Sequence, residues 1–598
     1  MHRASHILIV FGAVLIGAHC LHGAPASATQ SESRPTPTIE TPLPTPGMGW
    51  STYNFFVARH NAELFKRTAQ AYTDAGLRDA GYMTLRIDGG WWGDDSNRRW
   101  YYWTEKGTYE GGAPYQPGDP HVDPKNYPQG LKALAGDLHE RGFKLGFYLA
   151  PELSTGISDN YPGNKETKQQ PPVTGLALIE QHARWAANNG VDHLFYDGYD
   201  WNQSKGEEAY IHMFRSLRKE AARVERPIAF SINSGWKARP RDWADEWRTS
   251  PDINGEWRQI RENLASCAEP GKTAGKGHWN NPDYLMVGFV EDELAKSQMS
   301  LWCVIAAPLY LSHDFRVLND WDRYVLLNTE AIAVNQDPAG MPGRRLRSDA
   351  TGEIWARSLA DGSQAVVLLN ADDKPKAVSI GWDALGIAAG PVQVRDLWAH
   401  QNLGALDGGY TTAELPPRGC SMIRVKAGAD PLALPEAKWA KHPGKKPALV
   451  PLSTTGWTAT TNMSRKDDPL PNLFDGDAKT GWWSYAGADN RLDIDFGKLL
   501  TFDRVVIDHR GVGPNPWPYK VHALRSTFSL QVSEDGKIFR PVAEDSFGPS
   551  YTRIDVEQQS ARYLRVVIKE IERTSAYSDT SWHAKDVFLF NTAVQQGH

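Results

Sequence analysis

Short apolar runs alternate with longer amphipathic segments from Met48 to about residue 338. The short runs are rich in β-branched and aromatic residues, which predicts strands. They read MGWSTYNF, YMTLRIDGGWW, FKLGFYLAPE, VDHLFYDGYDW, PIAFSIN, EWRTSPDI, HWNNPDYLMVG and APLYLSHDF. Apolar spacings of three and four predict helices at 64–81, 130–142, 176–190 and 209–221. This alternation over 47–338 is typical of a (β/α)8 TIM barrel; a doubly wound open sheet is the alternative, but the Gly-rich phosphate turn expected there is missing.

The pattern changes after NQDPAGMPG, near residue 340. Apolar strands without intervening helices predict a small antiparallel β domain over 339–428. A stretch rich in Pro, Ala and Lys, 429–453, is predicted to be a linker. Short strands with turn residues between them then fill 454–598 and predict a β-sandwich.

The N-terminus resembles a processing segment rather than part of the fold. A basic start, MHRASH, precedes the apolar run ILIVFGAVLIGAHCL and a small-residue cleavage site near Ala28. This order predicts a secretory signal peptide at 1–28, followed by a Pro/Thr-rich linker at 29–46. The run is short for a membrane span, so we expect no transmembrane segment after its removal. The expected location is secreted, periplasmic or cell-surface; a lipid anchor on Cys20 is disfavoured by the bulky His19 before it.

Composition narrows the classes of partner. The 598 residues carry a net charge of −6 with no long charge run, so nucleic acid is not an expected partner. The chain holds 23 Trp and 22 Tyr, which suits either aromatic packing in β-rich cores or stacking on the apolar face of a sugar. Three cysteines follow the signal peptide and allow one disulfide at most. The oligomeric state is left open.

Polar side chains stand at the ends of the predicted barrel strands. They are Asp88, Glu152, Asp197, Asn233, Arg248, Asp252, Asn281, Asp283, His313 and Asp314. The carboxyl ends of parallel barrel strands form one mouth, where active sites lie. Carboxylates and aromatic residues around such a mouth, in a secreted protein, favour hydrolysis of an oligo- or polysaccharide by a carboxylate pair. We expect no cofactor for catalysis.

These motifs also resemble a known family, the melibiase-type α-galactosidases. The resemblance covers about residues 47–428 and is carried by MGWSTYN, GYMTLRIDGGWW, KLGFYL, GVDHLFYDG, EWRTSPDI, GHWNNPDYL, AAPLYLSHD and AIAVNQDPAG. It implies a retaining mechanism with Asp197 as the nucleophile and Asp252 as the general acid/base. Taken singly, Asp197 also fits a turn before Gly198, and Asp252 fits a helix N-cap.

The resemblance further implies which residues hold the sugar. Asp88 would bind a hydroxyl of the terminal sugar, and Arg248 would lie at its 2-substituent. Trp50, Tyr53 and Tyr148 would line the pocket, and Asn233 is a further candidate contact.

Three positions depart from the family pattern. Gly89 stands where a second aspartate is usual, Phe195 where a lysine is usual, and Asn281 where an aspartate is frequent. The catalytic pair is therefore intact, while the set that recognises galactose is altered. We expect an α-galactosidase, with an isomalto-dextranase or a β-L-arabinopyranosidase as the alternative specificities. A catalytically inactive carbohydrate-binding surface protein is a further alternative.

The C-terminal segment resembles the discoidin-type (coagulation factor C-terminal) sugar-binding domain, a jelly-roll β-sandwich. The matching stretches are NLFDGDAKTGWW, LDIDFG, FSLQVSEDGKIF and ARYLRVVI. Its DGDAKT loop suggests a structural Ca²⁺ held by Asp475, Asp477 and Thr480, with Asp586 nearby in the fold. The alternative is an Asp-Gly turn without a metal.

Overall fold

The structure is a computed structural model that describes part of the chain. The described residues are 41–56, 60–91, 107–108, 114–115, 119–120, 122–149, 175–197, 204–233, 243–268, 274–313, 320–388, 390–428, 432, 451–462, 469–475, 480–485, 489–508, 527–546, 551–570, 581–584 and 586–592. The predicted signal peptide and most of both predicted linkers lie outside these residues. Their extents, like the domain boundaries, stay predictions.

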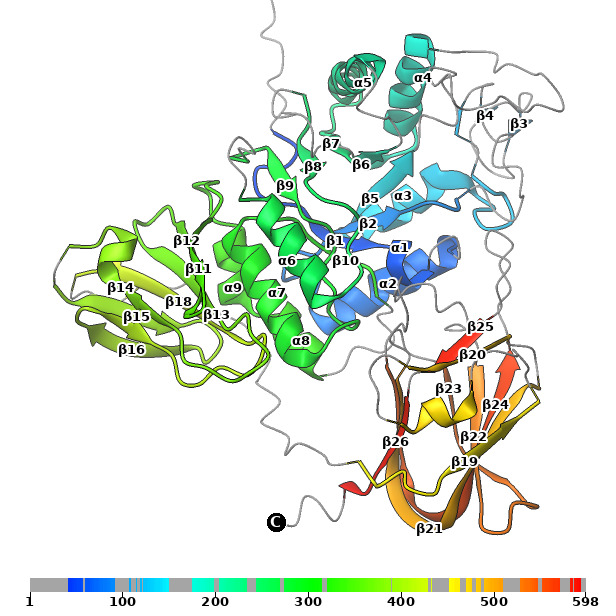
Figure 1. Cartoon of the computed structure of the whole chain (residues 1–598). Helices are drawn as coiled ribbons and strands as arrows, with labels where there is room; N and C mark the ends of the chain where they lie inside the picture. Colours follow the sequence, from blue (N-terminus) through cyan, green and yellow to red (C-terminus); the bar gives the residue numbers. More distant parts are fainter. Residues whose placement is uncertain are drawn as a thin grey trace, which may run out of the picture. The chain divides into compact units, whose positions relative to one another are not determined.

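A sheet of eight parallel strands forms the first part of the fold (Figure 1). Its strands are β1 (Met48–Ser51), β2 (Thr84–Ile87), β5 (Lys144–Leu149), β6 (Val191–Tyr196), β7 (Ala229–Ile232), β8 (Glu246–Arg248), β9 (Trp279–Asn281) and β10 (Leu309–Leu311). Their spatial order is β10-β1-β2-β5-β6-β7-β8-β9, so each neighbours the next along the chain. A parallel bridge between Leu285 and Leu311 brings the segment after β9 to β10 and closes the barrel. The predicted (β/α)8 fold is confirmed.

Helices connect the strands, as the spacing of apolar residues predicts. They are α1 (Tyr53–Phe56), α2 (Ala62–Ala75), α3 (Gly130–Glu140), α4 (Gly175–Asn188), α5 (Ser204–Arg223), α6 (Trp257–Ser266), α7 (Asp292–Val304), α8 (Asp320–Leu326) and α9 (Thr329–Asn335). A short hairpin, β3 (Gly107–Thr108) and β4 (Pro114–Tyr115), lies between β2 and α3. Helix α2 begins where the Asn61 side chain accepts the Leu64 N–H, and ends at Gly76, whose φ of 81° favours glycine.

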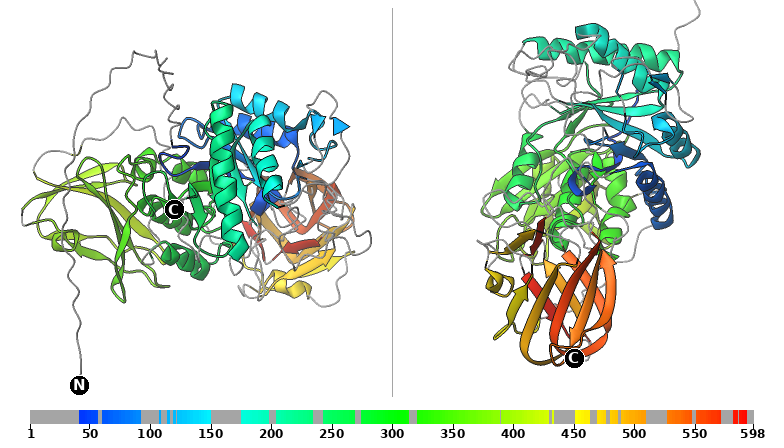
Figure 2. Two further views of the ribbon diagram at one scale, coloured as in Figure 1. Left: turned by 90° about the horizontal axis from the view of Figure 1, so that it is seen from above. Right: turned by 90° about the vertical axis from the view of Figure 1, so that its right-hand side faces the viewer.

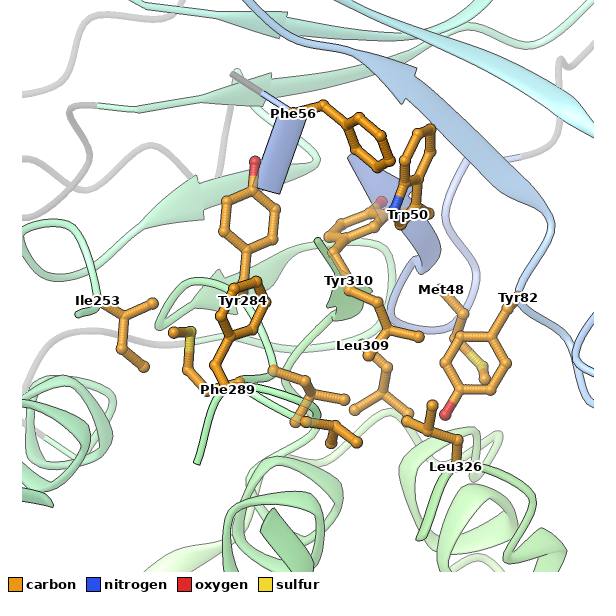
Figure 3. Close-up of a cluster of buried hydrophobic side chains, with 14 of the residues drawn as sticks. Met48, Trp50, Phe56, Tyr82, Ile253, Tyr284, Phe289, Leu309, Tyr310 and Leu326 are labelled. Carbon is orange, nitrogen blue, oxygen red and sulfur yellow. The ribbon is translucent and has the colours of Figure 1, made fainter. Parts of the chain in front are cut away.

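The barrel core is filled by the apolar positions of the strands and helices. Figure 3 shows part of it, where Met48 and Trp50 of β1 lie beside Leu309 and Tyr310 of β10. Cys303 is buried, as its apolar surroundings in the sequence predict, and the described cysteines are free thiols. Within the described part of the chain, no helix has the length and apolar content needed to span a membrane.

The second part is an antiparallel sheet with the order β11-β12-β13-β18-β15-β16, as predicted. The strands are β11 (Arg344–Asp349), β12 (Gly352–Ser358), β13 (Gln364–Leu369), β15 (Val392–Asp396), β16 (Gln401–Leu406) and β18 (Cys420–Ala427); β14 (Ser379–Gly381) and β17 (Gly409–Thr411) pair separately. Both faces of β13 are covered. Val366 and Leu368 belong to the core of this domain, whereas Val367 and Leu369 join the cluster that includes the barrel residues.

The C-terminal part is the predicted β-sandwich (Figure 2). Its strands are β19 (Thr458–Thr461), β20 (Trp482–Tyr485), β21 (Arg491–Asp508), β22 (Thr527–Ser533), β23 (Arg540–Ser546), β24 (Tyr551–Glu570), β25 (Ser581–Ala584) and β26 (Asp586–Phe590). The stretches RLDIDFG and FDRVVID, each expected to form a strand of its own, are joined in the single strand β21. The register against β24 shifts between Asp495 and Leu500, where Gly497 has a φ of 73°, so the chain bends there without ending the strand.

Candidate active site

The predicted polar residues follow strands of the barrel that all run in the same direction. Asp88 follows β2, Asp197 follows β6 and Asn233 follows β7. Arg248 is the last residue of β8, and Asn281 is the last of β9. Their side chains therefore belong to one end of the barrel, the end at which barrel enzymes carry their active sites.

Asp197 is held by hydrogen bonds from two neighbouring strands. The Tyr148 hydroxyl of β5 donates to Asp197 Oδ2 at 2.9 Å, and the Asn233 side chain after β7 donates a second bond. Burial raises the pKa of the Asp197 carboxyl, and these two hydrogen bonds oppose the rise because they stabilise the charged form. The nearby Asp252 carboxylate adds to the rise, whereas Arg248 lowers the pKa. Asp197 is thus an oriented carboxylate at the barrel mouth.

Arg248 joins both predicted catalytic carboxylates in one network. Its Nη1 donates to Asn233 Oδ1 at 3.1 Å, and Asn233 in turn binds Asp197. Its Nη2 donates to Asp252 Oδ1 at 3.2 Å and to the Ser250 carbonyl at 3.1 Å. The same Nη2 lies 2.7 Å from Asp283 Oδ2. Arg248 therefore connects β6, β7, β8 and the segment after β9.

Asp252 is the exposed member of this network. Its side chain is 37% exposed, whereas that of Asp283 is 5% exposed. The N-cap of α6 is Glu256, so Asp252 does not serve as that helix cap. The following N–H, of Ile253, donates to Asp283 Oδ2 at 2.9 Å and fixes the backbone beside Asp252. A carboxyl in this position can exchange a proton with a molecule at the mouth.

Asp88 lies deeper and is bonded on both oxygens. Ser51 Oγ donates to Oδ2 at 3.1 Å, and the Tyr284 hydroxyl lies 3.2 Å from the same atom. The Gly89 N–H donates to Oδ1 at 2.8 Å. The Asp88 N–H donates to Thr52 Oγ1 at 3.0 Å, which fixes the backbone as well.

The predicted aromatic residues differ in their surroundings. Tyr148 is half-buried, and its ring centroid lies 5.9 Å from that of Phe195. Burial raises the pKa of the Tyr148 phenol, and the Asp197 and Asp88 carboxylates add to the rise, with a smaller contribution from Tyr53, which is half-buried on α1. Trp50 is fully buried, and its Nε1 donates to the His313 carbonyl at 2.9 Å. Their roles as sugar contacts stay predictions.

Some predicted positions lie outside the described residues, among them Glu152, Asp314 and Asp477. Of the predicted calcium ligands, Thr480 Oγ1 donates to Asp475 Oδ2 at 2.7 Å, and Asp586 is buried at the start of β26. Among the described residues, which do not include Asp477, no cluster of three or more His, Cys, Asp or Glu has metal-binding geometry. The calcium site stays a prediction.

Sequence reasoning missed two charged residues below the mouth, Arg86 and Glu246. Both are buried in strands of the barrel. The alternation of side chains along a strand could have indicated both residues. Arg86 precedes Asp88 by two positions, and Glu246 precedes Arg248 by two positions. Residues two apart in a strand lie on the same face, so each of the two lies on the same face as a predicted site residue.

Comparison with known proteins assigns this arrangement to a family. The profile of the alpha galactosidase A family matches residues 45–337. An α-galactosidase from Cyamopsis tetragonoloba is 32% identical over 386 residues, which cover 63% of this chain and 85% of that protein. The chain belongs to the alpha-galactosidase family. It is a glycoside hydrolase, and its substrate is a sugar.

The remaining parts of this alpha-galactosidase family member also match known domains. The alpha galactosidase C-terminal β-sandwich profile matches residues 349–425, and the F5/8 type C (discoidin) profile matches 456–584. A solved structure from Bacteroides fragilis, described as a candidate α-galactosidase/melibiase, is 30% identical with a TM-score of 0.53, over 64% of this chain and 80% of that one. A β-L-arabinopyranosidase from Geobacillus stearothermophilus shares the fold, at 21% identity and a TM-score of 0.55, over 66% of this chain and all of that one.

Proposed function

We propose that this family member is a secreted retaining α-galactosidase that cleaves a terminal α-linked sugar by double displacement. The proposal is carried by one observation: Asp197 and Asp252 lie in a single hydrogen-bonded network, joined through Asn233 and Arg248. The activity named for the relative from Cyamopsis tetragonoloba supports the substrate. The basic and apolar N-terminal run supports secretion.

The two carboxyl groups have different surroundings, which suits different roles. Asp197 accepts hydrogen bonds from Tyr148 and Asn233, so its lone pairs are oriented for attack on the anomeric carbon. Attack forms a covalent glycosyl-enzyme while Asp252, protonated and exposed, donates its proton to the departing oxygen. Asp252 then takes a proton from water, and that water cleaves the intermediate with overall retention.

Two variants and product stereochemistry test the mechanism. Asp197→Ala should abolish turnover of every glycoside. Asp252→Ala should spare the first step for substrates with a good leaving group, because such groups need little protonation. NMR of the first-formed sugar should show retained configuration. Asp79→Ala, which removes an exposed aspartate, is the matched control and should leave kcat/KM unchanged. Inverted product would reject the double displacement.

A second specificity is favoured by Gly89 and Phe195. Neither residue can bond a sugar hydroxyl through its side chain, and Phe195 is buried against Tyr148. A site that bonds a hydroxyl discriminates strongly against a sugar that lacks it, and a site without such a bond gains no such preference. A β-L-arabinopyranosidase or an isomalto-dextranase activity is therefore the alternative.

A parallel screen separates these activities. We would compare kcat/KM for an aryl α-galactoside, an aryl β-L-arabinopyranoside and dextran. The highest value for the α-galactoside supports the main proposal, and a higher value for either of the others replaces it. Absence of turnover on all glycosides, despite both carboxylates, would favour a carbohydrate-binding role.

A further inference from the structure

A buried cation lies directly beneath Asp88 in the barrel. Arg86 is on the same face of β2, two residues before Asp88, and is 1% exposed. A buried guanidinium without partners is strongly unfavourable, because it loses its hydration. Its contacts therefore indicate what it does.

Arg86 contacts two hydroxyl groups and lies over several aromatic rings. Its Nη2 donates a hydrogen bond to the Tyr284 hydroxyl, and its Nε donates to Ser51 Oγ at 3.4 Å. The guanidinium carbon lies 4.3 Å from the ring centroid of Phe195 and 5.2 Å from that of Tyr310. Both distances are within the range of cation–π attraction, so these rings stabilise the charge. Figure 3 shows Tyr284 and Tyr310 among the buried side chains of this region.

Both hydroxyl groups also contact Asp88 and so lie between it and Arg86. Ser51 Oγ and the Tyr284 hydroxyl lie 3.1 and 3.2 Å from Asp88 Oδ2, and Arg86 Nε lies 3.7 Å from the same atom. An arginine can only donate hydrogen bonds, and a carboxylate can only accept them. Each hydroxyl can therefore accept from Arg86 and donate to Asp88, which gives the network one direction and holds Oδ2 in place.

We propose that Arg86 is a positioning residue for sugar recognition, which acts through Ser51 and Tyr284 to hold the Asp88 carboxylate toward a hydroxyl of the terminal sugar. The inference rests on the proposed function, because it takes Asp88 as a sugar contact. Gly89 brings no second carboxylate to this position. Without a carboxylate at position 89, the orientation of Asp88 matters the more.

Variants of the network test the proposal on the glycoside that the wild-type enzyme cleaves best in the parallel screen. Arg86→Met and Tyr284→Phe should raise KM and lower kcat/KM by roughly 10- to 100-fold, by analogy with residues that orient metal ligands. Arg86→Lys keeps the charge but not the planar set of donors, so its loss should be smaller. Arg357→Met is the matched control, because Arg357 is equally buried but donates to the backbone carbonyls of Cys303, Val334 and Asn335. It should lower the melting temperature without changing KM.

Deoxy substrates separate positioning from a general structural effect. The Asp88→Asn variant is assayed on a series of deoxy substrates, each lacking one hydroxyl. The hydroxyl that Asp88 binds is the one whose absence makes the loss of kcat/KM in Asp88→Asn smallest. On that deoxy substrate, Arg86→Lys and Tyr284→Phe should lose most of their effect as well. Equal losses on all deoxy substrates, or an unchanged KM, would overturn the proposal.

The same measurements distinguish a failure of this inference from a failure of the proposed function. If the wild type prefers another glycoside to the α-galactoside, the α-galactosidase proposal fails, and the variants are compared on the preferred substrate. If it cleaves none, binding of monosaccharides measured by calorimetry replaces KM, with weaker binding expected for Tyr284→Phe and unchanged binding overturning the proposal. If Arg86→Met does not fold, Ser51→Ala and Tyr284→Phe test the same contacts.

Discussion

Phe195 shows how one substitution changes the chemistry below the mouth. Its ring lies against the Arg86 guanidinium on one side and near the Tyr148 ring on another. A lysine, which is usual in the family at this position, would place an ammonium group beside that guanidinium. The arginine and the phenylalanine are therefore complementary, and restoring the family residue alone should not restore the family site.

We predict that Phe195→Lys lowers the free energy of unfolding by about 3 kcal/mol, because it buries a second cation next to Arg86. Phe195→Leu is the control, since it removes the ring without adding charge and should cost less. Chemical denaturation measures both. The combined variant Gly89→Asp with Phe195→Lys should recover stability, because the new carboxylate can pair with the ammonium. A Phe195→Lys protein as stable as the leucine control would show that the ammonium already has a partner.

The pH dependence of stability should contain a contribution from Glu246. Burial raises the pKa of this carboxyl to about 7, although Arg86 and hydrogen bonds from Ser231 and Asn281 oppose the rise and Asp245 adds to it. The folded state then holds a proton that the unfolded state releases above its ordinary pKa of 4.5. The contribution of Glu246 is therefore complete below pH 4.5 and is lost as the pH rises through 7.

Glu246→Gln should remove this contribution. The unfolding free energy should be lower at pH 8 than at pH 5. This difference should be larger in the wild type than in the variant, by up to about 3 kcal/mol. Parallel pH profiles of the two proteins would contradict the assignment.

At the scale of elements, the contact between α9 and β15 depends on a buried ion pair. Arg395 Nε and Nη2 each lie 2.7 Å from an oxygen of Glu330, and His400 Nδ1 lies 2.8 Å from Oε1. Burial alone would raise the pKa of Glu330, but the bonds from Arg395 and His400 outweigh it, so the net shift is downward. The carboxylate charge is thus held between the barrel and the second sheet.

Arg395→Met should therefore destabilise the protein by about 3–5 kcal/mol, because Glu330 is left buried without its main partner. Thermal unfolding measures the effect, with Arg344→Met, which removes an exposed arginine of β11, as the control. The Arg395→Met variant should keep its activity on a small glycoside at low temperature, because Arg395 and Glu330 do not contact the residues of the barrel mouth network. Equal melting temperatures for the two variants would contradict this account.

At the scale of the whole molecule, the discoidin-type part is expected to act as a separate module. The stretch 429–453 is predicted to be a linker, and the sheet that follows has its own strand order. Truncation near residue 450 should leave kcat/KM on an aryl glycoside nearly unchanged. Activity on a polymeric substrate should fall, because a tethered sugar-binding module raises the effective concentration of the enzyme at the polymer.

The isolated module added back in trans should not restore that activity, because the tether is absent. Activity can be followed by release of reducing sugar from the polymer. Loss of folding on truncation, or undiminished activity on the polymer, would show that the module has a different role.

The sequence alone determined the order and type of the main elements, and it indicated the candidate carboxylates of the site. Each barrel strand and each of the four predicted helices was found, because backbone geometry imposes periods of two and 3.6 residues on any element with one buried face. Asp88 and Asp197 stood out because a buried carboxylate at the end of an apolar strand is unfavourable without a partner, and Asp252 stood out through the family motif that contains it.

Only the tertiary structure decided which residues act together. Arg86 and Tyr284 are 198 positions apart in the chain, and Arg248 binds groups that come from three different strand ends. Likewise, two apparent strands of the C-terminal sandwich proved to be the single strand β21. Such contacts depend on strand register and on the curvature of the closed barrel. The local periodicity of the sequence predicts neither the register nor the curvature, because it indicates only which face of an element is buried.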